Sequence, residues 1–368
     1  MKAAVYYGQK DIRVEDVALP SPAEGELLIA ISSVGICGTD AAEFEYGPSL
    51  FPISHRHAVT GHSGPMVPGH EFAGVVAGVG AGVTGFSEGD LVTSGAGISC
   101  GSCSMCQAGR TNLCASYSTV GLERNGGLAE FTTAPAVACV NLEQRSISSD
   151  VAALAQPMSI AVHAMRRGQI SRGDDVVVLG AGAIGAFLIH AASREGANVT
   201  AVDLDPRRLE AARALGATAT VQTNRDSSIT AQLLAQGLQP KITYECTGVP
   251  PAVEAAVTVT ERGGRIVIVG LQKKPVPVEL LAVTLQEKEL TGTMAHVFNA
   301  DFGHAVDLVE NERDLWALVA PDVLPLDDLV DEGLRPMIEN RDTPIKTLLD
   351  PRIESKRPID VGQNDGDR

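Results

Sequence analysis

Residues 176–208 read VVVLGAGAIGAFLIHAASREGANVTAVDLDPRR, and this stretch decides the fold of the middle of the chain. Short β-branched runs alternate with longer helical patterns here and further downstream. The predicted strands are 176–179, 198–203, 242–246 and 265–270, and the predicted helices are 183–196, 206–216 and 251–259. Regular alternation of strand and helix is typical of a parallel, doubly wound sheet, so an α/β domain is expected from about residue 172.

A glycine-rich turn follows the first predicted strand and opens the first helix. Its residues are Gly180, Gly182, Ala183, Ile184 and Gly185. The first glycine permits a tight turn, the second lets the backbone approach a pyrophosphate, and the third lets the helix pack on the strand. The helix N-terminus can then face the phosphates. The pattern predicts a dinucleotide site, and the alternative is that these glycines only pack a buried turn.

An acidic residue, Asp203, ends the next predicted strand. A carboxylate at this place accepts hydrogen bonds from both ribose hydroxyls and repels a 2′-phosphate, which favours NAD over NADP. Arg207 and Arg208 follow closely, and an arginine there can meet a phosphate, which weakens the preference. We include Arg208 among the predicted cofactor-binding residues.

Four of the seven cysteines lie within GISCGSCSMCQAGRTNLC, residues 97–114. They are Cys100, Cys103, Cys106 and Cys114. Tetrahedral zinc takes four thiolates, and this spacing supplies them from one loop in which Gly101 and Gly109 permit tight turns. Four sulfur ligands leave no open position, so the predicted zinc is structural. An iron–sulfur cluster is the competing interpretation, and four unligated cysteines are another.

The first 150 residues carry short strand-like runs, such as 26–32 and 71–80, separated by turn signals, which predicts a compact β barrel. Within it, GICGTD places Cys37 after a strand, and PGHEFAG places His70 beside Glu71. A thiolate, an imidazole and a carboxylate that leave one position open have the composition of a catalytic zinc site. Spacing alone leaves the alternative that Cys37 is a small core residue and His70 a buried, hydrogen-bonded histidine.

Composition argues against several classes of partner. The net charge of −16 disfavours nucleic acid and anionic membrane surfaces, because both repel an acidic protein. The N-terminal segment lacks the apolar core and cleavage site of a secretory signal. The longest apolar stretch, 176–193, is interrupted by glycines and a histidine, which favours a strand, a turn and a buried helix over a membrane span. We therefore expect a cytoplasmic location, where cysteines serve as thiols and metal ligands.

Taken in order, four motifs resemble those of the zinc-containing medium-chain alcohol dehydrogenase family. They are CGTD from residue 37, PGHE ending at residue 71, the four-cysteine loop, and GAGAIG followed by an aspartate. The stretches HAVTGHSGPMVPGHEFAG and QPMSIAVHAMRR are similar to the 2,3-butanediol and sorbitol dehydrogenase branch. The likeness runs from residue 1 to about 351.

This resemblance implies a GroES-like β-barrel catalytic domain plus a Rossmann doubly wound parallel-sheet domain. The expected boundaries are 1–157 for the first part of the catalytic domain, 158–291 for the NAD-binding domain and 292–351 for the return to the catalytic domain. Residues 352–368, RIESKRPIDVGQNDGDR, are expected to form a disordered tail. Homodimers or homotetramers built on the Rossmann sheets are also implied.

The resemblance further implies roles for individual residues. Cys37, His70 and Glu71 would hold a catalytic zinc, and Thr39 would stand near the reacting oxygen. At the ends of the later strands, the nicotinamide half of the cofactor site would be lined by Cys246, Thr247, Val269 and Leu271. The expected cofactors are therefore NAD and two zinc ions, one catalytic and one structural.

Two positions depart from the family pattern. Gln156 stands where many polyol and butanediol dehydrogenases have a glutamate, and glutamine brings neither charge nor basicity. Ala42 stands where the family often has a proton-relaying histidine. The proton route is therefore open: it can use water, or one of the histidines upstream of His70. Those histidines are His55, His57 and His62, and the plainer interpretation of each is a solvated loop residue.

The sequence predicts an NAD-dependent zinc alcohol dehydrogenase (EC 1.1.1.-) that acts on a small-molecule secondary alcohol or ketone. Zinc would serve as a Lewis acid on the substrate hydroxyl, and hydride would pass to the nicotinamide. A vicinal diol, polyol or cyclitol is the expected substrate, and an amino-sugar alcohol or an amino-acid hydroxyl is an alternative. A different class, a catalytically weakened NAD(H) sensor or partner protein, is favoured only by Gln156 and Ala42.

Overall fold

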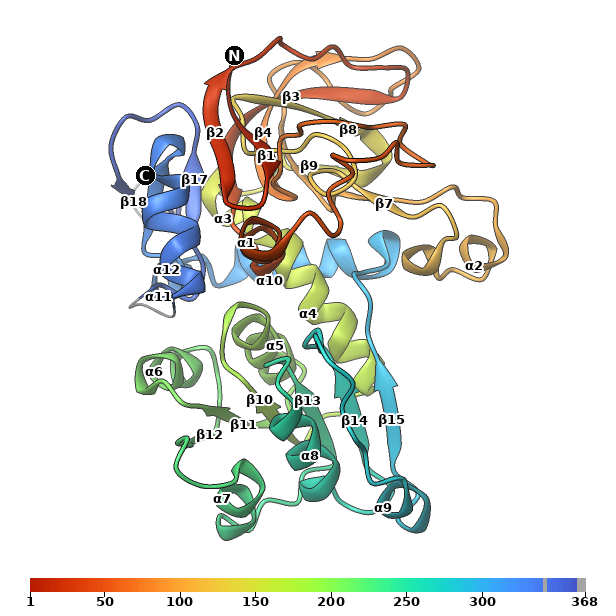
Figure 1. Ribbon diagram of the computed structural model, residues 1–368, viewed down its shortest axis with the longest axis vertical. Coiled ribbons are helices and arrows are strands. Elements are labelled where there is room, and N and C mark those ends of the chain that lie inside the picture. The colour runs from red at the N-terminus through yellow and green to blue at the C-terminus, as the bar shows by residue number, and fades with distance from the viewer. Residues whose placement is uncertain (340–342, 363–368) are drawn as a thin grey trace. The chain divides into compact units, whose positions relative to one another are not determined.

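A computed structural model describes residues 1–339 and 343–362 (Figure 1). The chain divides into two compact units, one formed by Met1–Ser159 with the segment from His296 onward, the other by Ile160–Ala295. The sequence placed the corresponding boundaries at 157/158 and 291/292. The first unit is thus discontinuous in sequence, and the second is one uninterrupted segment.

The second unit contains one six-stranded parallel sheet with helices between the strands (Figure 1). Its strands are β10 Asp175–Leu179, β11 Asn198–Asp203, β12 Ala219–Gln222, β13 Ile242–Glu245, β14 Arg265–Ile268 and β15 Glu289–Gly292. Its helices are α5 Ala183–Arg194, α6 Pro206–Ala214, α7 Ile229–Ala235, α8 Pro250–Val259 and α9 Leu280–Leu285. The spatial order β12-β11-β10-β13-β14-β15 is that of a doubly wound dinucleotide-binding sheet.

The order of strands in this sheet reverses between β10 and β13. Chains leaving the carboxyl ends of these two strands diverge, and ligands of doubly wound sheets bind in the crevice that results. Strand β10 is buried except at Asp175, in keeping with a strand that is covered on both faces. The apolar stretch 176–193 is therefore a strand, a turn and a helix, as predicted. No helix among the described residues combines the length and apolar character needed to cross a bilayer.

The first unit is rich in β structure. A hairpin pairs β1 Lys2–Gly8 with β2 Asp11–Asp16, and β6 Gly97–Ile98 pairs with β7 Ser118–Thr119. The main sheet has the order β18-β16-β17-β3-β4-β5-β9, and β8 also pairs with β3. These strands are β3 Glu26–Gly35, β4 Glu71–Val79, β5 Leu91–Ser94, β8 Phe131–Pro135, β9 Cys139–Asn141, β16 Asp322–Pro325, β17 Leu348–Asp350 and β18 Arg357–Pro358.

Strand β3 is the hub of the first unit, because β4, β8 and β17 all pair with it. At its carboxyl end, Gly35 lies opposite Glu71 in β4 and opposite Leu348 in β17. The register therefore brings together the segments that carry Cys37, His70 and Glu71. A core of buried aliphatic side chains with few aromatic ones, including Leu27, Ile29 and Ile31 of β3, lies beneath.

Short helices complete the first unit. They are α1 Gly38–Tyr46, α2 Ser104–Gln107, α3 Ser149–Ala153, α10 Gly303–Asn311, α11 Trp316–Val319 and α12 Arg335–Ile338. Helix α3 packs on β3, β4 and β5, and α1 packs on α12. Helix α4, Ala155–Gly168, begins in the first unit and ends in the second.

The prediction of a disordered tail over 352–368 is wrong for residues 352–362. Strand β18 pairs antiparallel with β16, and Arg357 donates to the buried Asp150 at 2.5 and 3.0 Å. The backbone N–H of Asp360 donates to the same carboxylate at 2.8 Å. A polar composition misled the prediction, because a buried acceptor far away in sequence supplies the ordering interactions. Residues 363–368 lie outside the described residues.

Candidate active site and metal sites

Cys37, His70 and Glu71 converge at the carboxyl end of β3. Cys37 precedes α1, while His70 and Glu71 stand where β4 begins. Their ligand atoms, one from each residue, all lie within 4.8 Å of one another. His70 is 6% exposed, Glu71 is 1% exposed and Cys37 is half-buried. A sulfur, a nitrogen and a carboxylate oxygen thus face one point from two separate elements.

Asp40, which the sequence analysis did not single out, links the two elements. Its Oδ2 accepts from the Cys37 backbone N–H at 2.8 Å and so closes the first turn of α1. Its Oδ1 lies 3.9 Å from His70 Nδ1. Thr39 Oγ1 lies 3.8 Å from Cys37 Sγ, so the hydroxyl stands beside the thiol as expected. The spacing CGTD, with an acid three residues after Cys37, is the signal that could have identified Asp40.

Glu71 has a second buried partner, Lys346, which comes from the segment before β17. The lysine Nζ forms an ion pair with Glu71 Oε2 and also donates to the Ile36 carbonyl at 2.8 Å. Gly35 gives this pair room, because a Cβ there would overlap Glu71 Oε2. Nothing local in the sequence identifies Lys346, since its partner lies 275 residues earlier (346 − 71).

The electrostatics of this cluster favour a cationic centre. Burial by itself lowers the pKa of His70, but the negative charges of Cys37 and Asp40 raise it to about 10. Burial raises the pKa of Asp40, and the neighbouring imidazole opposes this shift. The donor set, a thiol, an imidazole and a carboxylate oxygen with Asp40 beside the imidazole, fits a divalent cation.

The four-cysteine loop brings its sulfurs together as predicted from spacing. The four Sγ atoms lie within 4.8 Å of one another, and none of the four cysteines is in a disulfide. Backbone N–H groups point at them: Cys100 N donates to Cys114 Sγ at 3.3 Å, and Cys103 N donates to Cys100 Sγ at 3.4 Å. Gly101 and Gly109 have φ of +70° and +72°, so both turns need glycine.

Within this loop the cysteines differ in their ease of ionisation. Hydrogen bonds from the Ser102 backbone and hydroxyl lower the pKa of Cys100 to about 6. Burial raises the pKa of Cys106 to about 11. Four converging sulfurs supplied with N–H donors fit a closed tetrahedral ion such as zinc, since donors stabilise thiolate charge.

The glycine turn lies at the crevice of the second unit. Gly180 has φ of +95°, and a Cβ there would lie 2.7 Å from Thr247 Cγ2. A Cβ at Gly185 would overlap the Gly180 carbonyl oxygen, so this glycine seats α5 against the strand. At Gly182, the N-cap of α5, the nearest atom to a Cβ would be Arg208 Nη1 at 3.7 Å. The space over Gly182 is therefore open.

Asp203 braces that turn. Its Oδ2 accepts from Ala181 N at 2.7 Å and its Oδ1 from Asp205 N at 2.9 Å. Arg208 Nη1 lies 4.0 Å from Asp203 Oδ2, whereas Arg207 Nη2 donates to Asp205 Oδ2 at 2.8 Å. Of the two arginines, Arg208 is the one held beside the glycine turn.

The residues expected on the nicotinamide side follow β13 and β14. Cys246 and Thr247 come directly after β13, and Cys246 N donates to the Leu179 carbonyl at 2.9 Å. Val269 follows β14, and the side chain of Leu271 is 81% exposed. Burial, reinforced by the charge of Glu245, raises the pKa of Cys246, so this thiol stays neutral. Of the four, Thr247 contacts the glycine turn, since its Cγ2 would lie 2.7 Å from a Cβ at Gly180.

Two of the histidines proposed to replace the relay, His57 and His62, make hydrogen bonds within their own turn. Burial raises the pKa of Glu123, and the imidazoles of His57 and His70 both lie close enough to this carboxyl to oppose the shift. His57 N donates to the His62 carbonyl at 2.8 Å, and His57 Nδ1 lies 3.1 Å from Thr60 Oγ1. His62 Nε2 lies 3.2 Å from the Gly64 carbonyl, and His55 is exposed. These contacts tie the two histidines to their own turn. Gln156 is 6% exposed in α4, and Ala42 is half-buried in α1.

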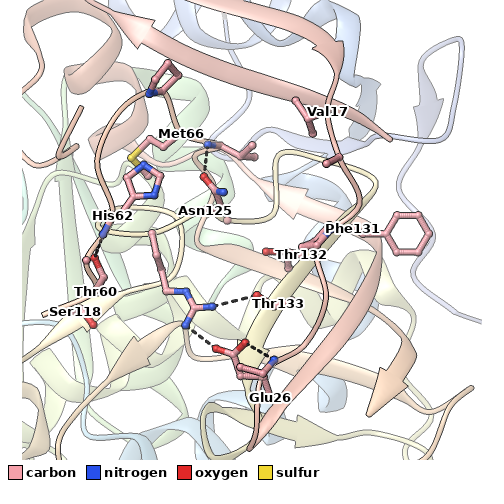
Figure 2. A pocket seen from close by; sticks show the side chains of 18 of the residues that line it. Val17, Glu26, Thr60, His62, Met66, Ser118, Asn125, Phe131, Thr132 and Thr133 are labelled. Carbon is pink, nitrogen blue, oxygen red and sulfur yellow. Dashed lines mark hydrogen bonds and ion pairs between the residues drawn. The ribbon is translucent and has the colours of Figure 1, made fainter. Parts of the chain in front are cut away.

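A cavity of about 800 Å³ lies in the first unit, apart from both ligand sets (Figure 2). None of the predicted metal-ligating or cofactor-binding residues lines it. Arg124 lines it and donates to Glu26 Oε1 at 2.7 Å and to Thr133 Oγ1 at 3.0 Å. His62 lines the same cavity.

The second unit is a parallel doubly wound sheet with a glycine turn where its strand order reverses. The first unit is rich in β structure and gathers thiol, imidazole and carboxylate ligands. These two units in one chain define the class of two-domain zinc dehydrogenases. A model of the alcohol dehydrogenase GroES-like domain matches residues 23–144, and a model of zinc-binding dehydrogenases matches residues 183–311. The chain belongs to the zinc-containing medium-chain alcohol dehydrogenase family and is an oxidoreductase. The expected fold class is confirmed.

Similarity to individual relatives extends over almost the whole chain. (R,R)-butanediol dehydrogenase of Neisseria gonorrhoeae is 30% identical over 356 residues, which is 96% of this chain and 100% of the relative. Sorbitol dehydrogenase of Homo sapiens is 33% identical over 297 residues, 79% of this chain and 81% of the relative. The crystal structure of 2R,3R-butanediol dehydrogenase from Bacillus subtilis superposes with a TM-score of 0.86 at 29% identity, covering 95% and 99% of the two chains.

Proposed function

We propose that this protein is an NAD-dependent dehydrogenase that interconverts a secondary alcohol and a ketone. The observation that carries the proposal is the convergence of the ligand atoms of Cys37, His70 and Glu71 within 4.8 Å. Three protein ligands with one position left for substrate are the arrangement of catalytic zinc sites. A zinc ion bound there supplies Lewis-acid polarisation of the substrate oxygen.

The chain's own residues orient the reaction. Asp40 holds the Cys37 backbone and faces His70 Nδ1, so it fixes both ligands in place. Lys346 balances the charge of Glu71, which makes the buried carboxylate tolerable when the metal is absent. Thr39, beside Cys37 Sγ, takes the proton of the substrate hydroxyl and passes it to water, since Ala42 provides no relay.

The second unit binds the nucleotide in this proposal. The Gly180–Gly185 turn and the N-terminus of α5 hold the pyrophosphate, and Asp203 accepts from the ribose hydroxyls. NAD supplies the hydride acceptor. Asp203, 9% exposed and facing the turn, repels a 2′-phosphate, so NAD is preferred although Arg208 lies 4.0 Å from its carboxylate.

Cys100, Cys103, Cys106 and Cys114 hold the second, structural zinc of the proposal. The substrate class that we propose is a vicinal diol, polyol or cyclitol. Similarity across the whole chain to a butanediol dehydrogenase, and over four-fifths of it to a sorbitol dehydrogenase, supports this class. The NAD(H)-sensor alternative is not favoured, because those relatives are dehydrogenases by name.

We also propose that two copies of the chain associate through the second unit. Strand β15 is an edge of the parallel sheet, and α9 beside it in sequence buries none of its residues. Leucines there are largely exposed: Leu280 at 64%, Leu281 at 62%, Leu285 at 72% and Leu290 at 41%. An uncovered sheet edge with an adjacent apolar surface is the kind of face that a partner covers.

The test combines metal analysis with alcohol-dependent NADH formation over a panel of diols, polyols and cyclitols. We expect two zinc ions per chain in the parent. Cys37→Ser and His70→Ala should each abolish turnover and lower the zinc content to one, while NADH binding persists. Cys139→Ser, which removes a buried thiol outside both clusters, should keep both zinc ions. Full activity in Cys37→Ser or His70→Ala, or higher catalytic efficiency with NADP, would overturn the corresponding assignment.

A further inference from the structure

Glu245 is a fully buried carboxylate at the reversal point of the parallel sheet. It is the last residue of β13 and is 0% exposed. Its Oε1 accepts from Thr247 N at 2.7 Å, from Thr247 Oγ1, and from Gly248 N at 3.0 Å. Its Oε2 accepts from Gln272 Nε2 at 3.0 Å. Four donors from two different loops thus meet on one side chain.

Those two loops follow β13 and β14 and pack closely on each other. The Glu245 carbonyl accepts from both Val269 N and Gly270 N at 2.8 Å. A Cβ at Gly270 would overlap Gly248 N and lie 2.8 Å from Glu245 Oε2, so only glycine allows the loops this approach. The carboxylate therefore sits between the loops and joins them through hydrogen bonds to Thr247, Gly248 and Gln272.

The same loops carry the residues proposed to face the nicotinamide. Thr247 also reaches the glycine turn, since its Cγ2 would lie 2.7 Å from a Cβ at Gly180. The loop after β13 is therefore held at Thr247 both by the turn and by Glu245. A buried carboxylate that accepts four hydrogen bonds holds a loop in one conformation before the ligand arrives.

We infer that Glu245 is a positioning residue for the nicotinamide half of the cofactor, acting through the loops that carry Thr247 and Val269. This inference rests on the proposed use of NAD. Because Glu245 acts on one end of the crevice, its removal should weaken ligands that carry the nicotinamide ring and spare those that end at the ribose. A general loss of stability in the second unit would weaken both.

Gln272 gives a prediction for the conservative variant. Its Oε1 is buried and accepts no hydrogen bond among the described residues. In Glu245→Gln, the new amide oxygen can take the Thr247 and Gly248 donors, and the Gln272 amide can turn so that its free oxygen accepts the new N–H. The link between the loops would survive. In Glu245→Ala every side-chain bond to Glu245 is lost.

The experiment titrates NADH and ADP-ribose, which lacks the nicotinamide, against the full-length protein and its variants. We expect Glu245→Ala to weaken NADH binding about tenfold or more and ADP-ribose binding by no more than about twofold. Glu245→Gln should restore NADH binding to within about threefold of the parent. The matched control is Glu254→Ala, which removes an exposed carboxylate from neighbouring α8 and should bind both ligands as the parent does.

The outcomes separate the inference from the function on which it rests. A parent that binds neither ligand contradicts the proposed use of NAD. A parent that binds both, together with a Glu245→Ala variant that loses both equally or keeps both, overturns the inference about Glu245. If Glu245→Ala does not fold, Gln272→Ala removes only the side-chain hydrogen bond from the loop after β14 to Glu245 and must weaken NADH binding more than ADP-ribose binding. A Gln272→Ala variant that weakens NADH and ADP-ribose binding equally, or weakens neither, would also overturn the inference about Glu245.

Discussion

The three glycines of the GAGAIG turn do different physical work, and the structure separates them. Gly180 needs its positive φ, Gly185 needs to lack a side chain because α5 touches the turn, and Gly182 needs neither for folding. At Gly182 the backbone is extended, with φ −70°, and the space beyond it is open. A glycine that the fold does not require is explained by a ligand that approaches the backbone.

Alanine substitutions at Gly182 and Gly185 should therefore separate the effect on NADH binding from the effect on folding stability. Gly185→Ala should lower the free energy of unfolding by about 1–3 kcal/mol, because α5 must move off the Gly180 carbonyl. Gly182→Ala should change it by less than about 1 kcal/mol, yet weaken NADH binding about tenfold or more. Thermal unfolding by circular dichroism and NADH titration measure the two effects. Parental NADH affinity in Gly182→Ala would contradict the proposed pyrophosphate position.

Among individual residues, the sequence analysis predicted those that belong to short, recognisable motifs. Cys37, His70, Glu71 and the four cysteines are gathered as predicted, and their roles remain proposals. Lys346 and Glu245 were not identified. Each is meaningful only through a partner that the fold supplies: Lys346 through a strand pairing across the chain, Glu245 through loops that follow two different strands. Ordinary charged residues in ordinary contexts carry no local signal of this kind.

Among the elements, predicted strands and helices of the second unit match those observed, with ends shifted by a few residues. Two short strands, β12 and β15, were missed because they are edge strands with only partly buried side chains, so their hydrophobic pattern is weak. Strand β18 was missed for a related reason: it has two residues, and its order comes from Asp150 rather than from its own composition.

Tyr6 ties one element of the first unit to another and should make its stability depend on alkaline pH. The Tyr6 hydroxyl donates to the Glu43 carbonyl of α1 at 3.0 Å, and its ring meets Phe51 edge-on at 4.9 Å. Burial, together with the charge of Glu43, raises the pKa of Tyr6 from 10.0 to about 12. Folding thus stabilises the neutral phenol relative to the phenolate.

The sign of the effect follows from this difference. Below pH 10 the tyrosine is neutral in both states, and between pH 10 and 12 the unfolded chain loses a proton that the folded chain keeps. Stability should therefore fall as pH rises through that window, at up to about 1.4 kcal/mol per pH unit for one proton. Tyr6→Phe should be less stable at pH 8 by about 1 kcal/mol and should lose this part of the slope.

The free energy of unfolding of the parent and of Tyr6→Phe can be measured between pH 8 and 12 by urea unfolding. The fluorescence of Trp316, a buried residue of the first unit, reports the transition. Tyr46→Phe, at the exposed end of α1, controls for loss of a tyrosine hydroxyl. An unchanged alkaline slope in Tyr6→Phe would refute the role given to the buried phenol.

For the whole molecule, the exposed leucines of α9 predict an oligomer. Replacing Leu281 and Leu285 together by glutamate places two charges on a face that association would bury, so the double variant should be monomeric. Light scattering during size-exclusion chromatography measures the mass of the parent and the variant at the same concentration. Leu318→Glu, which puts one charge on an exposed leucine of the first unit, should keep the parental mass. A parent that is already monomeric would contradict the proposed association.

The discontinuity of the first unit has a consequence for synthesis on the ribosome. Residues 160–295 emerge as one continuous segment, so the parallel sheet can close while translation is still under way. Strand β3 must wait for β17, and Asp150 must wait for Arg357, until those later residues have been synthesised. A message interrupted before codon 346 would yield a nascent polypeptide with an intact nucleotide sheet but with Glu71 deprived of its buried cation.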